Sequence, residues 1–477
     1  MKVLFAASEI HPLIKTGGLA DVAGALPIAL RKKDVDVKLI MPAYRGILEK
    51  LAPVKSSINL GNPFGCGDLI LLETHLPESQ TPIYLVQCQS LFEREAGPYL
   101  DQQGHDFSDN DVRFAAFSWV CAMITQHGRL IGWQPDILHL NDWQTGLAAA
   151  YLAAWRLNHP PVVTTVHNLR YNGSFPLERF DEVRLPHDLL SIHGVEFYGR
   201  YSALKAGLVY ADAITTVSPT YAREILTAEY GDGLDGTLRS ASYKLSGILN
   251  GVDYNEWSPS IDPYIHSQYD LHSIDLKLQN KLALQRENNL PENAQALVFG
   301  VVSRLTEQKG LDLIPAAIEP ALQRGAMLIL LGSGDKSLEN QYLALQERYP
   351  EQVAIRIGYD EAYSHRLQAG VDALLIPSRF EPCGLTQLYA LKYGTLPIVR
   401  HTGGLADTVF EEGHQANGFV FYHASVEDLQ AALERSMEAF SNATTWRTLQ
   451  IQAMTQDHSW ERATEQWLQL YHSLLNH

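Results

Sequence analysis

The sequence contains little cysteine and no segment long enough to suggest a membrane anchor. Four cysteines occur in 477 residues, widely spaced and outside any Cys-x-x-Cys or Cys/His cluster, which argues against a disulfide framework or a zinc finger. The longest apolar stretch, around 146–155, is far shorter than the roughly 20 residues that span a bilayer. The opening MKVLFAASEIHP reaches Glu9 and His11 too early for a signal peptide. We therefore expect a reducing compartment, the cytoplasm.

Positive charge is also scarce. The chain has 37 Lys and Arg against 54 Asp and Glu, a formal net charge of −17, which disfavours nucleic acid and anionic membranes as partners. A neutral polymer or a small molecule fits better. With 46% hydrophobic and 19% charged residues, the composition is that of an ordinary globular protein, and the length favours two domains.

Short apolar runs rich in β-branched residues alternate with segments of helical periodicity, a pattern that predicts β-α-β units and parallel sheets with both faces covered. Helices are expected near 21–32, 145–156 and 385–393. The second series of strands starts afresh after a polar connector near 254–269, where the pattern predicts the domain boundary. We predict an α/β protein of two doubly wound, Rossmann-like parallel-sheet domains facing each other across a cleft. The expected strands are 3–8, 37–42, 137–141, 162–167 and 213–218, then 248–252, 297–304, 327–332, 353–358, 373–378 and 396–400.

One motif occurs twice. Thr16-Gly17-Gly18-Leu19-Ala20-Asp21-Val22 returns as Thr402-Gly403-Gly404-Leu405-Ala406-Asp407-Thr408. Each copy is a Gly-Gly turn before a predicted helix, so both are candidates for loops that face a phosphate or a sugar. Chance similarity between two helix starts is the alternative.

Ligands of open parallel sheets bind beyond the carboxyl ends of the strands. Lys15 stands there beside Gly17 and Gly18, whose backbone N–H groups can approach an anion closely. Arg304 and Lys309 follow a strand of the second domain and could bind one diphosphate together. Arginine offers a planar fork of hydrogen-bond donors, and lysine offers a compact positive charge. Solvated surface cations are the alternative in both places.

The segment Pro377-Ser378-Arg379-Phe380-Glu381-Pro382-Cys383-Gly384-Leu385-Thr386-Gln387 ends a strand and is expected to open a helix at Gly384. The N–H groups of Gly384, Leu385 and Thr386 then suit a diphosphate. Glu381 can accept hydrogen bonds from sugar hydroxyls, or it is only a charge at a helix start. Cys383 has no convincing local base and is interpreted as a packing or lining residue rather than a nucleophile.

Two further strand ends carry polar side chains, Asp142 and His167. A lone Asp is often a helix cap, and a lone His is often a satisfied core residue. Their shared location at carboxyl ends of neighbouring predicted strands favours a functional role.

Over nearly its full length the chain resembles the bacterial glycogen synthases and plant starch synthases, which are retaining glucosyltransferases with two facing Rossmann-like domains (GT-B type). The resemblance implies domains at 1–247 (acceptor and catalytic) and 248–455 (nucleotide sugar), with 456–477 returning to the first as a helix. The segments that carry it are KTGGLADVAGALP (15–27), GPYLDQQGHDFSDNDVRF (97–114), NDWQTGL (141–147), HNLRYNG (167–173), ILNGVD (248–253), SRLTEQKG (303–310) and PSRFEPCGLTQLYALKYGTLPIVRHTGGLADTV (377–409).

By this resemblance the chain transfers glucose from ADP-glucose to the non-reducing end of an α-1,4-glucan with retention of configuration. The residues that resemble those holding the diphosphate are Lys15, Arg304 and Lys309. The positions that resemble the phosphate loop are Gly18 and 383–386. Asp142, His167 and Glu381 resemble contacts to the transferred glucose. Tyr359 resembles the residue that stacks on adenine, and Asn250 an asparagine beside the donor.

No metal or cofactor is expected, because cationic side chains and a helix start take the place of a metal and no Asp-x-Asp lies at a convincing strand end. The pairs Asp34/Asp36 and Asp109/Asp111 sit elsewhere. The fold alone does not exclude a UDP-glucose enzyme with a small acceptor, such as a sucrose-forming enzyme, but the KTGGLADV and PCGLTQ segments, which resemble the glucan synthases in particular, argue against it. A glucan phosphorylase is disfavoured because no segment resembles a pyridoxal phosphate site. A non-enzymatic scaffold is disfavoured because all the cations expected at the site are present.

Overall fold

The computed structural model describes residues 1–476, which form two compact units. The first unit consists of Met1–Gly251 together with the C-terminal segment from Trp460 onward, and the second of Val252–Ser459. The sequence predicted the boundaries at 247 and 455. The second unit is therefore inserted into the first along the chain.

The first unit is built around a nine-stranded sheet in the order β12-β11-β7-β6-β1-β2-β5-β4-β3, in which β4 alone runs opposite to the others. The central strands β6 and β7 are buried along their whole length, because helices cover both faces of the sheet. A small antiparallel sheet, β8-β10-β9, accompanies it. The strands are β1 (Lys2–Ala6), β2 (Asp36–Pro42), β3 (Ser56–Asn59), β4 (Ile70–His75), β5 (Pro82–Gln87), β6 (Ile137–Asn141), β7 (Val162–Val166), β8 (Ser174–Pro176), β9 (Glu196–Phe197), β10 (Arg200–Ser202), β11 (Ala213–Thr216) and β12 (Leu245–Gly247).

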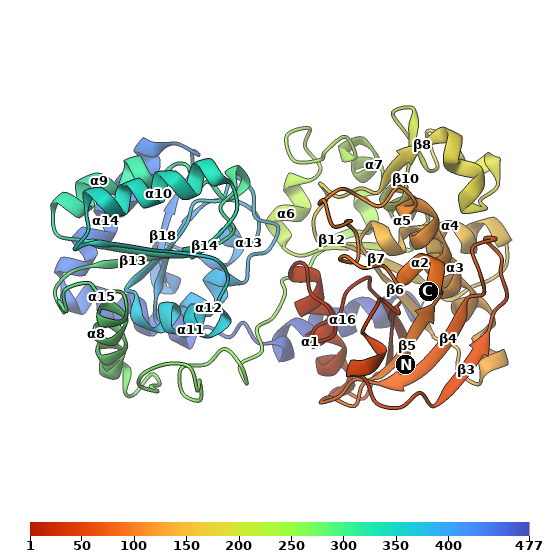
Figure 1. The fold of residues 1–477 in the computed structure, drawn as a ribbon, viewed down its shortest axis with the longest axis horizontal. Coiled ribbons are helices and arrows are strands. Elements are labelled where there is room, and N and C mark those ends of the chain that lie inside the picture. Colours follow the sequence, from red (N-terminus) through yellow and green to blue (C-terminus); the bar gives the residue numbers. More distant parts are fainter. Residues whose placement is uncertain (477) are drawn as a thin grey trace. The chain divides into compact units, whose positions relative to one another are not determined.

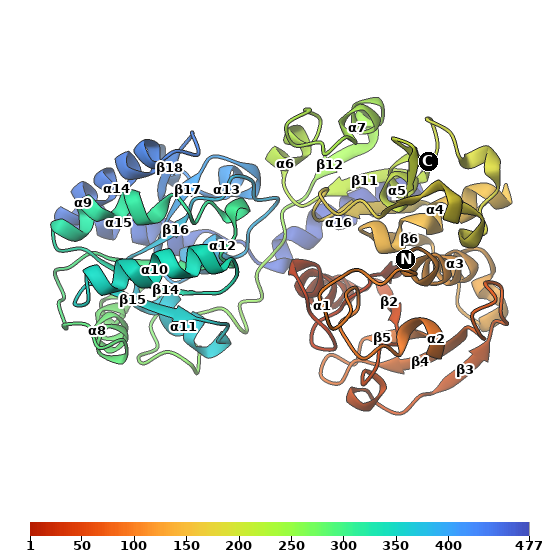
Figure 2. The same cartoon turned by 45° about the horizontal axis from the view of Figure 1, so that its top comes forward.

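Helices α3, α4 and α5 of the first unit pack side by side, and α1 lies along the C-terminal helix α16 (Figure 2). Close approach of α4 to α5 requires glycine at 146, since a side chain there would collide with the Ala203 carbonyl. The helices are α1 (Gly18–Arg31), α2 (Gln89–Phe92), α3 (Asn110–His127), α4 (Trp143–Trp155), α5 (Ala203–Tyr210), α6 (Pro219–Glu224), α7 (Asp235–Ser240) and α16 (Trp460–Leu475).

The second unit is a six-stranded parallel sheet in the order β15-β14-β13-β16-β17-β18. Figure 1 shows this sheet between α9 and α10 on one face and α11 and α12 on the other. Its elements are α8 (Lys277–Glu287), β13 (Val298–Val302), α9 (Ile314–Gln323), β14 (Met327–Gly332), α10 (Lys336–Arg348), β15 (Val353–Ile357), α11 (Glu361–Gly370), β16 (Ala373–Ile376), α12 (Thr386–Lys392), β17 (Leu396–Arg400), α13 (Gly403–Thr408), β18 (Phe419–Phe421), α14 (Val426–Ser441) and α15 (Ala443–Thr455).

One predicted strand is wrong. ILNGV (248–252) was expected to begin the sheet of the second domain, but the strand lies just before it, at β12, and pairs with β11 in the first unit. Within this segment, Val252 alone forms a β-type pair, an isolated parallel bridge with Ser459. The apolar residues in 248–252 misled the prediction because they are buried for a different reason: Ile248 belongs to the core of the first unit, and Gly251 lies against Trp460.

None of the four cysteines forms a disulfide. Among residues 1–476, the structure contains no helix with both the length and the apolar character needed to cross a bilayer.

The last helix completes the core of the first unit. Tyr471 on α16 is fully buried, and its hydroxyl lies 2.7 Å from Nδ1 of His139 on β6. The other ring nitrogen of His139 lies 2.7 Å from the Thr165 hydroxyl on β7, and Trp467 packs against the same imidazole. Burial lowers the pKa of His139 to about 3, so the ring is neutral in the folded protein.

We expect Tyr471→Phe to lower the free energy of unfolding of the first unit by about 1–3 kcal/mol, because it leaves a buried ring nitrogen of His139 without its partner. Ser473→Ala, at an exposed position of the same helix, is the control. Differential scanning calorimetry measures both variants. An equal midpoint for the two would show that the hydroxyl contributes nothing.

Candidate active site

The strand order of the first sheet brings the predicted polar residues to one edge. The chain leaves β1 toward β2 on one side, whereas β6 leads to β7 on the other side, so β1 and β6 flank a topological switch point. Ligands of open α/β sheets bind at the carboxyl ends of such strands. Asp142 follows β6 and His167 follows β7, and the structure brings these two residues into contact.

Asp142 has a backbone conformation that is rare for a residue with a side chain, with φ 56° and ψ −172°. Such a conformation costs on the order of 1–3 kcal/mol and persists only where its surroundings enforce it. Here the Asp142 N–H donates to the Thr165 carbonyl (2.9 Å), and the carboxylate accepts from the His167 N–H (2.7 Å). Asp142 does occupy the position before helix α4, but its side chain makes no capping bond. Helix capping therefore does not explain this residue.

The ionisation of both side chains is shifted by their surroundings. Burial raises the pKa of Asp142 to about 7, and burial lowers the pKa of His167 to about 3. Nε2 of the His167 ring lies 2.8 Å from Asn141 Oδ1. A neutral imidazole thus donates to the amide oxygen, which fixes the orientation of the ring at the strand end.

Glu9 is a site residue that the sequence reasoning missed. It follows β1, is almost fully buried, and accepts from the Thr16 N–H (2.5 Å) and the Thr16 hydroxyl (2.7 Å). Burial raises the pKa of its carboxyl, and Asp142 and Glu9 lie close enough to repel each other when both are charged. Its place directly after a strand was the signal that could have found it.

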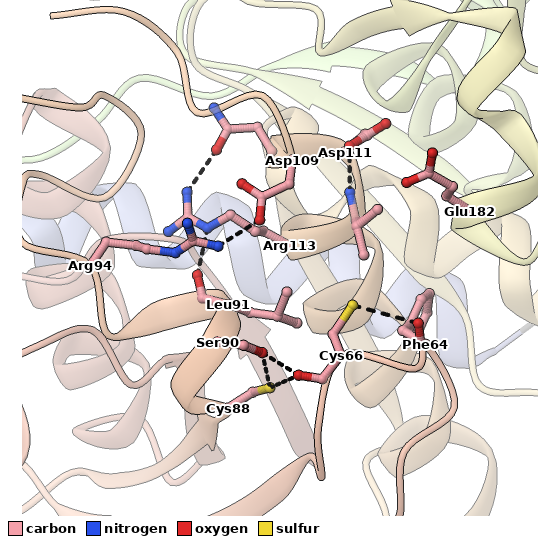
Figure 3. Close-up of polar contacts among 12 residues, drawn as sticks. Phe64, Cys66, Cys88, Ser90, Leu91, Arg94, Asp109, Asp111, Arg113 and Glu182 are labelled. Carbon is pink, nitrogen blue, oxygen red and sulfur yellow. Dashed lines mark hydrogen bonds and ion pairs between the residues drawn. The ribbon is translucent and has the colours of Figure 1, made fainter. Parts of the chain in front are cut away.

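The segment that precedes α3 is tied down by a buried arginine (Figure 3). Arg113 donates to the Leu91 carbonyl (2.6 Å), the Pro98 carbonyl (3.0 Å) and Asn110 Oδ1 (2.7 Å), while Arg94 pairs with Asp109. The Tyr99 hydroxyl lies 2.6 Å from the Ser8 hydroxyl, next to Glu9. The motif at 97–114 therefore holds a loop beside the carboxyl end of β1.

Neither Asp-x-Asp pair is available at a strand end. Asp109 pairs with Arg94, and Asp111 is buried and forms a bidentate ion pair with Arg179 at 2.5 and 2.7 Å. Asp34 lies in the turn before β2, and Asp36 is the first residue of that strand.

The other predicted residues of the first unit lie around the same edge. Lys15 is in the loop after β1, exposed, and paired with Asp21 at 2.8 Å. Gly18 is the first residue of α1 and faces open space. Asn250 is buried beyond the end of β12, so it belongs to the first unit rather than to the second domain, where the predicted boundary placed it.

In the second unit, β13 and β16 flank the switch point, and three predicted residues follow these strands. Lys309 Nζ lies 2.5 Å from Glu381 Oε2, which also accepts from the Ser378 hydroxyl at 3.0 Å. Arg304 is exposed, and its guanidinium makes no ion pair or hydrogen bond with the part of the chain that the structure describes. One cation is thus already held by a carboxylate, and the other is available to a ligand.

The predicted start of the next helix is wrong by two residues. Helix α12 begins at Thr386, because Gly384 has φ +73°, a left-handed conformation that cannot continue a helix. The Gln387 amide donates to the carbonyls of Cys383 and Gly384, both at 3.0 Å, and fixes the turn. Cys383 is buried, in keeping with a packing role, while Gly384, Leu385 and Thr386 are partly exposed.

The second Thr-Gly-Gly motif packs against this same turn. The Gly404 N–H donates to the carbonyls of Glu381 and Pro382, both at 3.1 Å. A Cβ at Gly403 would collide with the Glu381 carbonyl, and one at Gly404 would collide with the Cys383 carbonyl. The two glycines are therefore required for close approach of two backbones. The first copy differs, since a Cβ at Gly18 would meet no atom within 4 Å.

Tyr359 does not lie beside the other predicted site residues of the second unit. It follows β15 at the edge of the sheet, two strands away from β13, and its side chain is 76% exposed.

Two family models match the chain. The starch synthase catalytic domain matches residues 2–240, and glycosyl transferases group 1 matches residues 284–446. Together with the two Rossmann-like units and their strand-end residues, these matches define a GT-B type glycosyltransferase. A structure of the catalytic domain of starch synthase IV from Arabidopsis thaliana, described as bound to ADP and acarbose, is 30% identical with a TM-score of 0.87 and covers 100% of this chain and 99% of that one.

Curated relatives narrow the class. A glycogen synthase of Marinomonas sp. (strain MWYL1) is 68% identical over 100% of both chains, and one of Rhodospirillum rubrum is 46% identical over 100% of this chain and 99% of its own. The chain belongs to the glycogen synthase and starch synthase family, whose members transfer glucosyl units from a nucleotide sugar to a glucan. A sucrose-phosphate synthase from Thermosynechococcus elongatus, 17% identical with a TM-score of 0.61 over 100% of this chain and 99% of its own, shares the fold alone.

We expect Gly404→Ala to destabilise the second unit by about 1–3 kcal/mol or more, because the added methyl group forces two backbones apart. Gly18→Ala, at the matching position of the first motif, should leave the unfolding midpoint unchanged. Thermal unfolding of the two variants measures the difference. Equal midpoints would contradict the close-packing role of the second motif.

The raised pKa of Asp142 makes a prediction about pH. In the unfolded chain this carboxyl titrates near its ordinary value of 3.8, whereas in the folded protein it keeps its proton to about pH 7. Folding stability therefore falls as the pH rises between these values. The asparagine of the Asp142→Asn variant cannot ionise. The melting temperature of this variant relative to that of the wild type should therefore rise between pH 5 and pH 8.

The control for that measurement is Asp188→Asn, which removes an exposed carboxylate paired with Arg156 at the surface. Its difference from the wild type should vary little with pH above 5. A pH-independent difference for Asp142→Asn would show that Asp142 titrates normally.

Proposed function

We propose that the chain transfers glucose from ADP-glucose to the non-reducing end of an α-1,4-glucan with retention of configuration, and releases ADP. The observation that carries this proposal is the position of the predicted donor-binding residues at the switch points of both sheets. The starch synthase structure described with ADP and acarbose supports the choice of nucleotide and glucan chemistry.

In this proposal the departing ADP is stabilised by cationic groups. Arg304 and Lys309 follow β13, and Lys15 with Gly18 follows β1, so each offers charge or N–H groups beyond a strand end. The backbone at 384–386 adds N–H donors at the left-handed turn, and Cys383 is proposed to line the same site. Removing one donor aimed at developing charge typically costs about 3 kcal/mol, or about a hundredfold in rate.

The transferred glucose is bound by Asp142, His167 and Glu381 in this proposal. Lys309 and the Ser378 hydroxyl both contact Oε2 of Glu381 and hold that carboxylate in place. His167 is a neutral hydrogen-bonding group rather than a cation, because burial keeps its pKa at about 3. Neutral donors suit sugar hydroxyls and do not repel the positive charge that develops on the sugar.

The proposal also assigns roles to Tyr359, to Asn250 and to each of the two units. Tyr359 offers an exposed ring for adenine, and Asn250 is proposed to line the donor site. We assign the acceptor and catalytic role to the first unit and nucleotide-sugar binding to the second. Catalysis without a metal or cofactor and a cytoplasmic location stay predictions.

Radiolabelled glucose transfer tests the function. Purified protein is given ADP-glucose or UDP-glucose, with glycogen or maltose as acceptor, in the presence of EDTA. We expect transfer from ADP-glucose to glycogen that survives EDTA and collapses in Lys15→Ala. Transfer from UDP-glucose alone would assign a different donor, and no transfer from either would favour a binding scaffold.

Arg304→Ala tests the role of the free cation without disturbing the fold, because the side chain has no partner to lose. We expect kcat with ADP-glucose to fall about a hundredfold, with an unchanged melting temperature. Arg324→Ala is the matched control, since Arg324 is also exposed but follows helix α9 at the opposite edge of the sheet. Equal rates in the two variants would remove Arg304 from the site.

A further inference from the structure

A cluster of possible metal ligands lies in the second unit, on helix α11 and on the connector before α8. Glu256 comes from the connector before α8, whereas Glu361 and His365 lie one turn apart on α11. One ligand atom from each residue lies within 4.8 Å of the other two. Nitrogen and two carboxylate oxygens from separate segments thus converge on one point.

The imidazole of His365 is held in a fixed orientation. It is fully buried, and its Nδ1 lies 2.8 Å from Asp262 Oδ2, which also accepts from the Tyr393 hydroxyl at 2.5 Å. The indole of Trp257 stacks on the ring with a centroid distance of 3.7 Å and an interplanar angle of 15°. Neither rotation nor displacement of the ring is possible without breaking these contacts.

The second ring nitrogen of His365 has no hydrogen-bond partner although it is buried. Glu361 Oε1 lies 3.9 Å from this nitrogen, too far for a hydrogen bond. With Nδ1–H donating to Asp262, the neutral form of the ring presents the Nε2 lone pair within reach of the two glutamates. A buried acceptor without a partner is costly, and a cation at this point would satisfy it.

We propose that His365, Glu361 and Glu256 bind one divalent transition-metal ion, zinc by the chemistry of the ligands. Imidazole nitrogen favours zinc over magnesium and calcium, which prefer oxygen ligands alone. Asp262 behind His365 forms the carboxylate–histidine pair that orients metal ligands in many zinc sites.

The geometry can close on such an ion. Zinc bonds to nitrogen and oxygen are about 2.0–2.2 Å long, so the carboxylates must move toward the imidazole. Both can do so, because Glu256 is exposed and the Glu361 side chain is 40% exposed. The bound ion would tie the connector to α11, and a water molecule would complete a tetrahedron.

Sequence reasoning could not find this site. Two ligands have helical spacing, but the third precedes them by more than one hundred residues, and no cysteine takes part. The site is separate from the proposed reaction, in which no metal takes part, so glucose transfer in EDTA does not bear on it.

Cobalt is the probe, because it replaces zinc and gives visible absorption bands at sites with nitrogen and oxygen ligands. The full chain is treated with EDTA, desalted and titrated with Co²⁺, and bound cobalt is then displaced with Zn²⁺. We expect one cobalt per chain, displaced by one zinc. Glu361→Gln and Glu256→Gln should each weaken cobalt binding at least about tenfold, with melting temperatures of the metal-free proteins close to that of the wild type.

The matched control is His105→Gln. Asp101 and His105 form another acid–histidine pair at helical spacing, also 3.9 Å apart, but the imidazole is exposed and carries no buried partner. This variant should bind cobalt as the wild type does. Less than one cobalt per chain, or an affinity unchanged in both glutamate variants, would overturn the proposal.

Discussion

Parallel strands end at the same edge of a sheet, and the chemistry available to this chain depends on that constraint. Asp142, His167 and Glu9 are separated by up to 158 positions in the sequence, yet they meet because β1, β6 and β7 run in the same direction. Helices cover both faces of the sheet, so its carboxyl edge is where polar groups can cluster without interrupting the apolar core. The second sheet repeats the arrangement with Lys309 and Glu381.

Side chains at that edge take on properties that they lack in water. Burial keeps His167 neutral and shifts the ionisation of Asp142 toward neutral pH, while Asp142 has a strained backbone held by its neighbours on β7. Strain and shifted ionisation are both unfavourable for folding, and both occur at one residue. Sites that bind ligands commonly contain such locally unfavourable features.

The sequence was sufficient for the two α/β units, the family and most strand-end residues, because apolar runs and turn glycines are local signals. It failed where burial has a tertiary cause. ILNGV looked like a strand because it is apolar, although Ile248 is buried in the core of the first unit and Gly251 lies against Trp460. Gly384 looked like a helix start because it lies between a predicted strand and a predicted helix, but its positive φ marks a turn. The site position of Glu9 and the close packing of Gly404 against the turn at 381–383 depend on contacts between distant segments, which no local pattern records.

The insertion of the second unit has a consequence for synthesis on the ribosome. His139 obtains its partner Tyr471 only when the last helix has been made, so the first unit cannot finish its core until the whole of Val252–Ser459 has been translated. The inserted unit has its own ends joined, since the Val252 N–H donates to the His458 carbonyl at 2.7 Å. It can therefore complete its core before the first unit does, although its synthesis begins later.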